Sequence, residues 1–175
     1  MQLNDAISLI QHNSFHPEGK QAWADLGCGS GLFTQALASR LRPESVIYAI
    51  DDNSSALKNI FSYNHVDIRT QQSNFVTDDL KLAGLNGILM ANSFHYVKNK
   101  KELIQKLLHY LKEDHSYLII EYDTNKPVST WVPYPIGFES LKKLFSELHY
   151  TSVVKMNERP SIYGRANIYS AVIKR

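Results

Sequence analysis

The chain has 175 residues, of which 43% are hydrophobic and 21% charged, and its formal net charge is +2. This hydrophobic content is enough for one sizeable core, so two independent domains are not expected. Acidic and basic residues are interspersed and form no basic stripe, which argues against a dedicated nucleic-acid binder. The single cysteine, Cys28, excludes an internal disulfide and a thiolate metal site.

The start of the sequence has no pattern typical of secretion. Residues 1–5 lack a cationic segment followed by an apolar run, and no apolar stretch approaches the roughly 20 residues that span a bilayer. Together with the lone cysteine, this predicts a cytoplasmic protein that does not enter a membrane. The extension before the first predicted strand is short, so we expect any lid there to be small.

Strand-like and helix-like patterns alternate along most of the chain. Apolar, β-branched or aromatic runs predict strands at residues 21–26, 46–50, 66–70, 87–91 and 117–122. Helical spacing of apolar residues lies between them, at 32–41, 56–61 and 103–111. Strands that are apolar throughout and alternate with amphipathic helices predict a doubly wound α/β fold. Its mostly parallel, seven-stranded sheet would carry helices on both faces.

The last part of the chain departs from this alternation. A predicted helix at 138–148 is followed by two strand-like runs, 151–156 and 166–173, which predict a C-terminal antiparallel hairpin. Two long loops, 124–137 and 157–167, are candidates for a functional role. No repeat or linker divides the sequence, so we expect residues 1–175 to form a single domain.

The strongest local signal is the run A-W-A-D-L-G-C-G-S-G-L-F at residues 22–33, a strand that passes through glycines into a helix. Glycines permit a tight turn and close approach of the backbone to a ligand. Asp51 follows the next predicted strand, where a carboxylate can accept both hydroxyls of a ribose. An ordinary glycine turn and a helix cap or solvated acid are the structural alternatives. Because these residues fall in register, we favour a nucleoside-containing cofactor.

The spacing of the glycines separates two kinds of cofactor. The dinucleotide fingerprint G-x-G-x-x-G needs a glycine three positions after Gly29, where this chain has Leu32. The pattern from Asp25 to Gly31 is instead D-x-G-x-G-x-G. An acid before the glycines repels a pyrophosphate but can pair with a cationic amino group. This favours a cofactor that ends in an amino acid.

These residues resemble the motifs of the class I S-adenosylmethionine-dependent methyltransferase family, of the small-molecule type that includes ubiquinone and menaquinone biosynthesis methyltransferases. The matching blocks are residues 25–31, 51, 73–75 and 90–96. The resemblance implies S-adenosyl-L-methionine as cofactor, S-adenosyl-L-homocysteine as product, and no metal. The cofactor-binding residues that it implies are Asp25, Gly27 and Gly29 around the methionyl part, Asp51 at the ribose, Asn74 and Phe75 at the adenine, and Asn92 near the sulfonium. Cys28, Gly31 and Asp52 are further candidates for cofactor binding within these motifs.

Two positions differ from the family pattern. Asp52 stands where an apolar residue usually lies against adenine, and we expect it to turn to solvent while another apolar side chain covers the ring. Asn74 stands where an aspartate is usual, and its amide oxygen can still accept a hydrogen bond from the adenine amino group.

Methyl transfer from a sulfonium is a direct displacement, so catalysis depends mainly on holding the acceptor in line with the methyl group. His95, just beyond the fourth predicted strand, is the candidate base for a hydroxyl, phenol or protonated amine, and Tyr96 and Tyr122 are candidates to orient the acceptor. A packing role for His95 is the equal alternative. Aromatic residues of the loop 124–137 and its edge predict either a site for a flat acceptor or anchors of the loop: Trp131, Tyr134 and Phe138. Tyr163 and Arg165 are predicted rim contacts.

The acceptor itself is not identified by the sequence, and a small molecule is the favoured class. RNA or protein acceptors stay open, although N-S-F-H at 92–95 differs from the Asn/Asp-Pro-Pro-aromatic motif of enzymes that methylate exocyclic amines of bases. Two other functions compete. A non-catalytic partner subunit that binds S-adenosylmethionine is motivated by Asp52 and Asn74, and an NAD(P)-dependent oxidoreductase is disfavoured by Leu32. The oligomeric state is not predicted.

Overall fold

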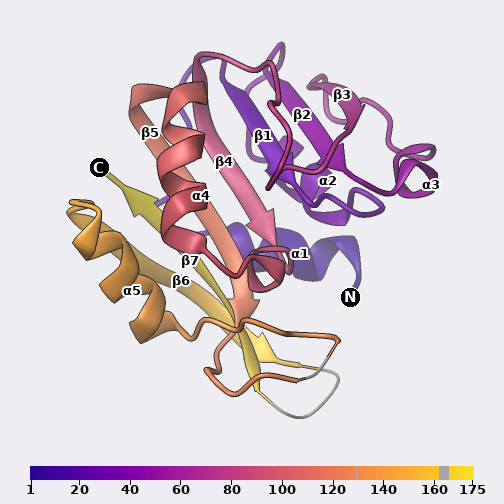
Figure 1. Ribbon diagram of the computed structural model, residues 1–175. Helices are drawn as coiled ribbons and strands as arrows, with labels where there is room; N and C mark the ends of the chain where they lie inside the picture. The colour runs from indigo at the N-terminus through magenta and orange to yellow at the C-terminus, as the bar shows by residue number, and fades with distance from the viewer. Residues whose placement is uncertain (129, 162–165) are drawn as a thin grey trace.

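The computed structural model describes residues 1–128, 130–161 and 166–175, and in it helices cover both faces of a central sheet (Figure 1). The strands are β1 (Ala22–Leu26), β2 (Val46–Asp51), β3 (Asp67–Gln72), β4 (Leu85–Ala91), β5 (Leu111–Tyr122), β6 (Ser152–Pro160) and β7 (Asn167–Lys174). The helices are α1 (Leu3–Ile10), α2 (Leu32–Ala38), α3 (Ser54–Leu57), α4 (Lys100–Leu107) and α5 (Phe138–Glu147), with 3-10 turns η1 (Phe94–Tyr96) and η2 (Leu108–Tyr110). Within these ranges, every helix is too short or too polar to cross a lipid bilayer.

The seven strands are ordered β3-β2-β1-β4-β5-β7-β6. Strands β1 to β5 run parallel, whereas β7 is antiparallel to both β5 and β6. This confirms the predicted mostly parallel sheet with a C-terminal hairpin. The order of the strands reverses at β1, which lies between β2 and β4, so the carboxyl ends of these three strands meet at a switch point where ligands commonly bind.

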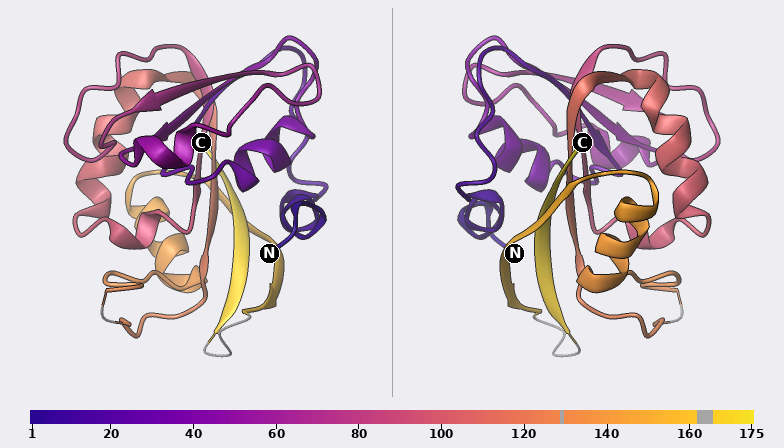
Figure 2. Two further views of the ribbon diagram at one scale, coloured as in Figure 1. Left: turned by 90° about the vertical axis from the view of Figure 1, so that its right-hand side faces the viewer. Right: turned by 90° about the vertical axis from the view of Figure 1, so that its left-hand side faces the viewer.

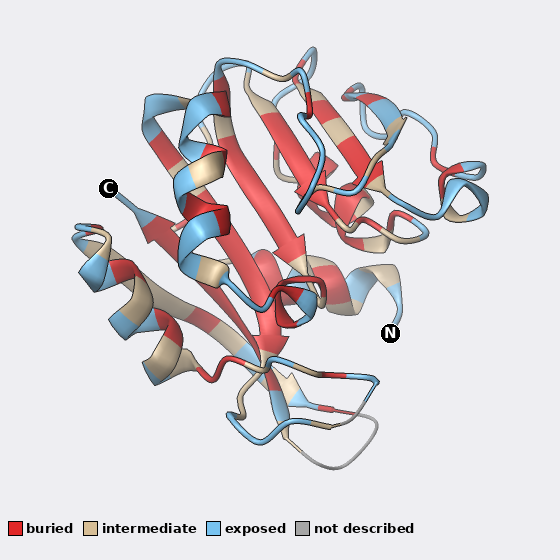
Figure 3. Ribbon diagram, viewed as in Figure 1, coloured by how far each residue is buried: buried red, intermediate tan, exposed pale blue. Residues whose placement is uncertain are grey.

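Two cores form on opposite faces of the sheet because successive side chains of a strand point to opposite sides. In β1, Trp23 belongs to the core that includes residues of α1 and α2, whereas Ala24 belongs to the core that includes residues of α4 and α5. In β5, Leu118 belongs to the first core and Ile119 to the second. Figure 2 shows these layers from the side, and Figure 3 shows the central strands as largely buried. The apolar runs therefore correspond to strands that are buried on both faces of the sheet, as predicted.

Several parts of the structure differ from the sequence expectations. The predicted helix 56–61 is the short α3, which ends at Leu57, and β5 begins at Leu111, within the predicted helix 103–111. Helix α1 was not predicted; Asn157 on β6 holds its carboxyl end by donating to the carbonyls of Leu9 and Gln11 at 3.1 and 3.0 Å. The predicted loop 157–167 is shorter than expected because β6 continues to Pro160, which pairs with Asn167. Proline is tolerated there because β6 is an edge strand, where one side of the backbone needs no partner.

Candidate cofactor and acceptor site

The glycine-rich turn after β1 requires glycine for conformational and steric reasons. Gly27, Gly29 and Gly31 have φ of 74°, 54° and 85°, in the left-handed region that side chains disfavour. A Cβ atom on Gly27 would lie 2.5 Å from the Cβ of Ser93, and one on Gly31 would lie 2.9 Å from Ile60. A Cβ on Gly29 would meet nothing within 4 Å. The turn therefore packs closely at its two ends and leaves open space at Gly29, where a ligand can approach the backbone.

Asp51, at the end of β2, shapes this turn directly. Its Oδ2 accepts the N–H of Gly29 at 2.8 Å, and its Oδ1 accepts the N–H of Asn53 at 2.9 Å. The cap of α3 is Asn53, whose side chain accepts the N–H of Ser55. Asp51 thus connects the ends of β1 and β2 and is not itself the cap. Asp52 is exposed, as expected.

Asp25, the last but one residue of β1, is completely buried. Thr34 donates to its Oδ2 at 2.6 Å, while its Oδ1 is buried with no hydrogen-bond partner in the described part of the chain. Burial raises the pKa of Asp25 to about 7; the hydrogen bond from Thr34 opposes this shift, and the nearby Asp51 carboxylate adds to it. An unpaired carboxyl oxygen next to a glycine turn fits a cationic amino group of a ligand.

The neighbouring Cys28 has no reactive character. Its side chain is buried, and its Sγ lies 3.7 Å from the carbonyl of Gly29. Burial raises the pKa of the thiol, and the carboxylates of Asp25 and Asp51 raise it further. The thiol therefore stays protonated, which argues against a role as nucleophile or metal ligand.

The segment after β3 is held in a compact turn. The Oδ1 of Asn74 accepts the N–H groups of Val76 and Thr77 at 3.0 and 3.3 Å. Lys106 on α4 donates to the carbonyls of Phe75 and Val76 at 3.3 and 3.0 Å. A Cβ on Gly27 would lie 3.4 Å from the ring of Phe75. Phe75 therefore borders the glycine turn, whereas the amide oxygen of Asn74 is already used within its own loop.

At the end of β4, Asn92 has a φ of 54°, and its N–H donates to the carbonyl of Ile120 at 2.8 Å. Its side-chain Oδ1 is buried, and no described residue donates to it. Asn92 also lines a cavity of about 400 Å³ together with His95 and Tyr96. We name this space the acceptor cavity. An orphan acceptor atom beside a cavity marks a position where a ligand supplies the missing donor.

His95 in turn η1 is buried and has a partner that the sequence did not reveal. Its Nδ1 lies 2.7 Å from Oε2 of Glu121, near the end of β5, and its backbone N–H donates to Oε1 of Glu121 at 3.0 Å. The side chains of His95 and Glu121 are 3% and 1% exposed. A carboxylate can only accept hydrogen bonds, so a neutral His95 carries its proton on Nδ1. Its Nε2 is then unprotonated and can accept a hydrogen bond.

The pair is further supported by its surroundings. The carbonyl of His95 accepts the N–H of Tyr134 at 2.9 Å. Lys100 on α4 donates to the carbonyls of Val97 and Tyr134 at 2.7 and 2.6 Å. Burial lowers the pKa of Lys100 to about 8, and the negative charge of Glu121 opposes that shift. An ammonium group near Glu121 thus offsets part of the cost of its buried charge.

The loop 124–137 forms one wall of the acceptor cavity. Val128, Trp131 and Val132 line it, with Tyr96 and Tyr122 among the remaining lining residues. Val128 and Val132 exchange backbone hydrogen bonds at 3.1 and 2.8 Å, which closes the tip of the loop. The predicted rim contacts Tyr163 and Arg165 lie outside the described residues. Of the predicted acceptor aromatics, the structure therefore places Tyr96, Tyr122 and Trp131 around one cavity.

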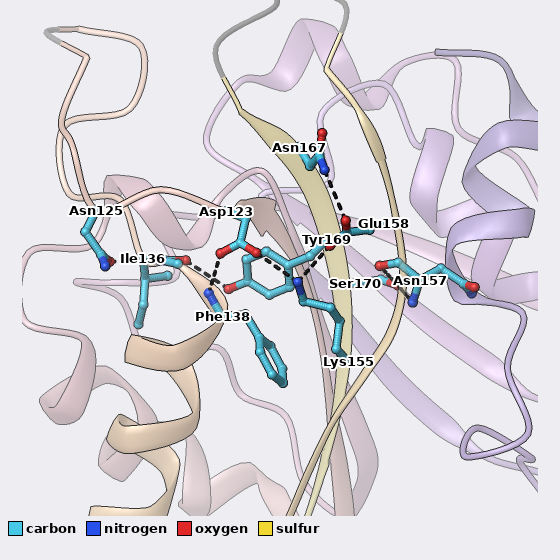
Figure 4. A network of polar contacts seen from close by, with 11 residues as sticks. Asp123, Asn125, Ile136, Phe138, Lys155, Asn157, Glu158, Asn167, Tyr169 and Ser170 are labelled. Carbon is cyan, nitrogen blue, oxygen red and sulfur yellow. Dashed lines mark hydrogen bonds and ion pairs between the residues drawn. The ribbon is translucent and has the colours of Figure 1, made fainter.

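The loop base consists of Asp123, Asn125, Gly137 and Phe138, and it fixes both ends of the loop (Figure 4). Oδ1 of Asp123 accepts the N–H of Phe138 at 2.8 Å, and Oδ1 of Asn125 accepts the N–H of Gly137 at 2.9 Å. Lys155 on β6 pairs with Oδ2 of Asp123 at 2.9 Å. Phe138 packs against Tyr169, with ring centroids 5.8 Å apart. Phe138 is therefore an anchor at the start of α5.

The residues present fit an S-adenosylmethionine cofactor better than a metal. In the described ranges, no group of three or more His, Cys, Asp or Glu side chains is arranged to hold a metal ion. The unpaired Oδ1 of Asp25, the open space at Gly29 and the unpaired Oδ1 of Asn92 lie at the carboxyl ends of β1 and β4. These are the positions at which the family resemblance expects the amino-acid part and the sulfonium.

Glu121 is the principal site residue that sequence reasoning missed. The signal for it was a charged residue inside the apolar run Leu118 to Tyr122, because carboxylates are rarely fully buried unless they are paired. The partner could not be named from the sequence because it depends on β4 and β5 being neighbours.

Comparisons with known proteins agree with this geometry. Residues 24–114, just over half of the chain, match the model of the family described as methyltransferase domain. Among curated proteins, none matches this chain.

Solved structures share the fold at low sequence identity. A 1,6-didemethyltoxoflavin-N1-methyltransferase from Burkholderia thailandensis has a TM-score of 0.72 and 16% identity, over 99% of this chain and 77% of its own. A SAM dependent methyltransferase from Archaeoglobus fulgidus has a TM-score of 0.67 and 14% identity, over 91% and 88%. The plantazolicin methyltransferase has a TM-score of 0.66 and 13% identity, over 99% and 83%. The chain therefore belongs to the methyltransferase domain family, with the fold of the class I S-adenosylmethionine-dependent methyltransferases that its motifs predicted.

Proposed function

We propose that this S-adenosylmethionine-dependent methyltransferase acts on a small molecule that binds in the acceptor cavity and loses a proton to His95. The observation that carries the proposal is the buried pair of His95 and Glu121 beside a cavity of about 400 Å³. Pockets of this size are typical of small ligands and too small for a folded macromolecule. The solved 1,6-didemethyltoxoflavin-N1-methyltransferase, which holds 1,6-didemethyltoxoflavin and S-adenosylhomocysteine, supports a small acceptor.

The cofactor, when bound, supplies an electrophilic methyl group on a sulfonium. In this proposal, Asp25 pairs with the amino group of the cofactor, and Asp51 accepts hydrogen bonds from the ribose hydroxyls. The turn from Gly27 to Gly31 lies against the methionyl part. Phe75 lies against the adenine, and Asn92 faces the methyl-bearing end. Asp52 faces solvent and Asn74 shapes its loop, so neither is needed for a direct contact.

His95 acts as the general base in this mechanism, and Glu121 positions it. Glu121 holds the backbone N–H and Nδ1 of His95 together, so Nε2 has its lone pair available for the acceptor. Tyr96 is 55% exposed, and its ring centroid lies 4.3 Å from that of His95, where it can orient an acceptor. Residues 1–175 act as one catalytic domain. A cytoplasmic location rests on the lone cysteine of the sequence.

The alternative of a non-catalytic subunit explains less of the site. A subunit that only binds the cofactor needs the residues around β1 and β2. It has no use for the buried contact between Glu121 and His95. Burying a charged pair is costly, and a purely structural role is served as well by apolar residues. The family assignment supersedes the oxidoreductase alternative.

The test has two parts. Titration calorimetry should show binding of S-adenosylhomocysteine to the wild type and to Glu121→Gln with similar affinity, because Glu121 does not contact the cofactor. With S-adenosylmethionine carrying a labelled methyl group, the wild type is then incubated with a cell extract separated into small molecules, RNA and protein. Label in the small-molecule fraction supports the proposal, whereas label transferred only to RNA or protein contradicts it.

The same assay tests the pair. In Glu121→Gln, the amide donates to Nδ1 and moves the proton of His95 to Nε2, so transfer to the small-molecule fraction should fall by about 10²–10⁴-fold. Glu102→Gln, a change of the same chemistry on the exposed face of α4, is the matched control and should retain activity.

A further inference from the structure

We infer that the acceptor is an uncharged, planar aromatic or heteroaromatic compound of one or two fused rings, bearing a hydroxyl or ring N–H that it gives to His95. This inference rests on the proposed function and specifies its substrate class. Three features carry it: the shape of the cavity, the character of its walls and the charges around it.

The walls favour a flat ring. Tyr96 from η1, Tyr122 from the end of β5 and Trp131 from the loop 124–137 approach the cavity from three separate elements. Tyr96 and Trp131 are 55% and 67% exposed, so their rings are accessible to a ligand. Aromatic rings gain from stacking on another ring as well as from burial. A volume of about 400 Å³, near the lower end for ligand pockets, limits the acceptor to one or two rings.

The walls are also ready before a ligand arrives. The loop base holds the loop 124–137 at both ends, and the N–H of Tyr134 ties it to the carbonyl of His95. A wall that is already in place loses less entropy on binding, and it selects for shape. The base and the aromatic wall therefore act as one unit.

The charges favour a neutral acceptor. The described polar residues that line the cavity include Asn92 and Thr124, whose side chains suit a neutral polar group. A cationic acceptor would also be repelled by the sulfonium of the cofactor. A carboxylate acceptor is already a nucleophile and needs no base, which would leave the buried pair of His95 and Glu121 without a use.

The proposed transfer needs only the acceptor, the cofactor and His95. As the acceptor oxygen or nitrogen forms its bond to the methyl carbon, the carbon–sulfur bond breaks and its electron pair stays on sulfur. The acceptor proton passes to Nε2 of His95 and then to water. The anionic character that develops on the acceptor is stabilised by the adjacent sulfonium, and no oxidant or reductant is involved.

The experiment uses the wild-type protein saturated with S-adenosylhomocysteine and four probes: 2-naphthol, the non-planar alcohol 2-decalol, 2-naphthoate and 2-naphthylmethylammonium. Binding is followed by the fluorescence of Trp131. The second tryptophan, Trp23, is buried against Phe15 and far less accessible to a ligand. The variant Trp131→Phe measures the fluorescence that Trp23 contributes. Methyl transfer is followed separately with S-adenosylmethionine.

We expect 2-naphthol to bind at least about tenfold more tightly than the other three probes and to be methylated on oxygen. Tightest binding of the carboxylate or the ammonium compound, equal binding of 2-decalol, or binding of no probe to the loaded protein would overturn the inference. Failure of the protein to bind S-adenosylhomocysteine would instead refute the proposed function. The two failures are thus distinguishable.

Discussion

Replacing Asp25 by asparagine should make the cofactor-free protein progressively more stable relative to the wild type as pH rises. The buried carboxyl has a pKa of about 7, against about 3.9 in an unfolded chain. The folded state therefore holds a proton that the unfolded chain releases, so the free energy of unfolding falls as pH rises between these values. This penalty is about 4 kcal/mol above pH 7 and about 1–2 kcal/mol near pH 5. Asparagine does not ionise, so the variant does not lose this stability as pH rises.

The difference in unfolding free energy between Asp25→Asn and the wild type should therefore increase by about 2–3 kcal/mol from about pH 5 to about pH 8. A constant cost of burying the new amide, about 1–3 kcal/mol, cancels in this comparison. Urea unfolding of both proteins without cofactor measures it, provided that their m-values agree. Asp52→Asn, a change of the same type at an exposed position, is the control. A difference that is the same at both pH values would refute the assignment of a buried, protonated Asp25.

Three further predictions concern the site and its support. Asp51→Ala removes the acceptor of two backbone N–H groups and should weaken binding of S-adenosylhomocysteine by about 1–3 kcal/mol in titration calorimetry. Gly27→Ala forces a methyl group to within 2.5 Å of Ser93 and should lower the free energy of unfolding by about 2 kcal/mol or more, measured by urea unfolding. Lys155→Met should change overall stability by less than about 1 kcal/mol, because its ion pairs are partly exposed. It should nevertheless speed hydrogen exchange in the loop 124–137, and unchanged exchange would contradict the role of the ion pair.

The sheet could be predicted because its physical requirements repeat at every strand. Apolar runs buried on both faces, such as the one ending at Ile50, have few other interpretations. Helix α1 could not be predicted with the same ease, because it is only eight residues long and its carboxyl end is held by Asn157, nearly 150 positions later in the chain. Short helices take most of their stability from such tertiary contacts.

The glycine-rich turn could be predicted from the sequence. For the candidate base, the sequence indicated His95 but not its partner Glu121. Asp25, the glycines and Asp51 are linked by spacing along two consecutive strands, and spacing is visible in a sequence. His95 and Glu121 lie 26 positions apart and meet because of strand order, which no local pattern encodes. Asn74 shows the opposite problem: its residue type suits an adenine contact, yet local backbone N–H groups occupy its oxygen first.

The loop base has a consequence for how enzymes of this kind diverge. Asp123 and Asn125 join the ends of the loop through their own side chains, and Ile136 packs in the core, so the ends of the loop are held independently of residues 126–133. Substitutions in residues 126–133 leave the contact of His95 with Glu121 in place. If the proposed function holds, acceptor preference and methyl-donor chemistry lie in two parts of one small protein, and changing residues 126–133 is the way to engineer a new acceptor preference at constant cofactor use.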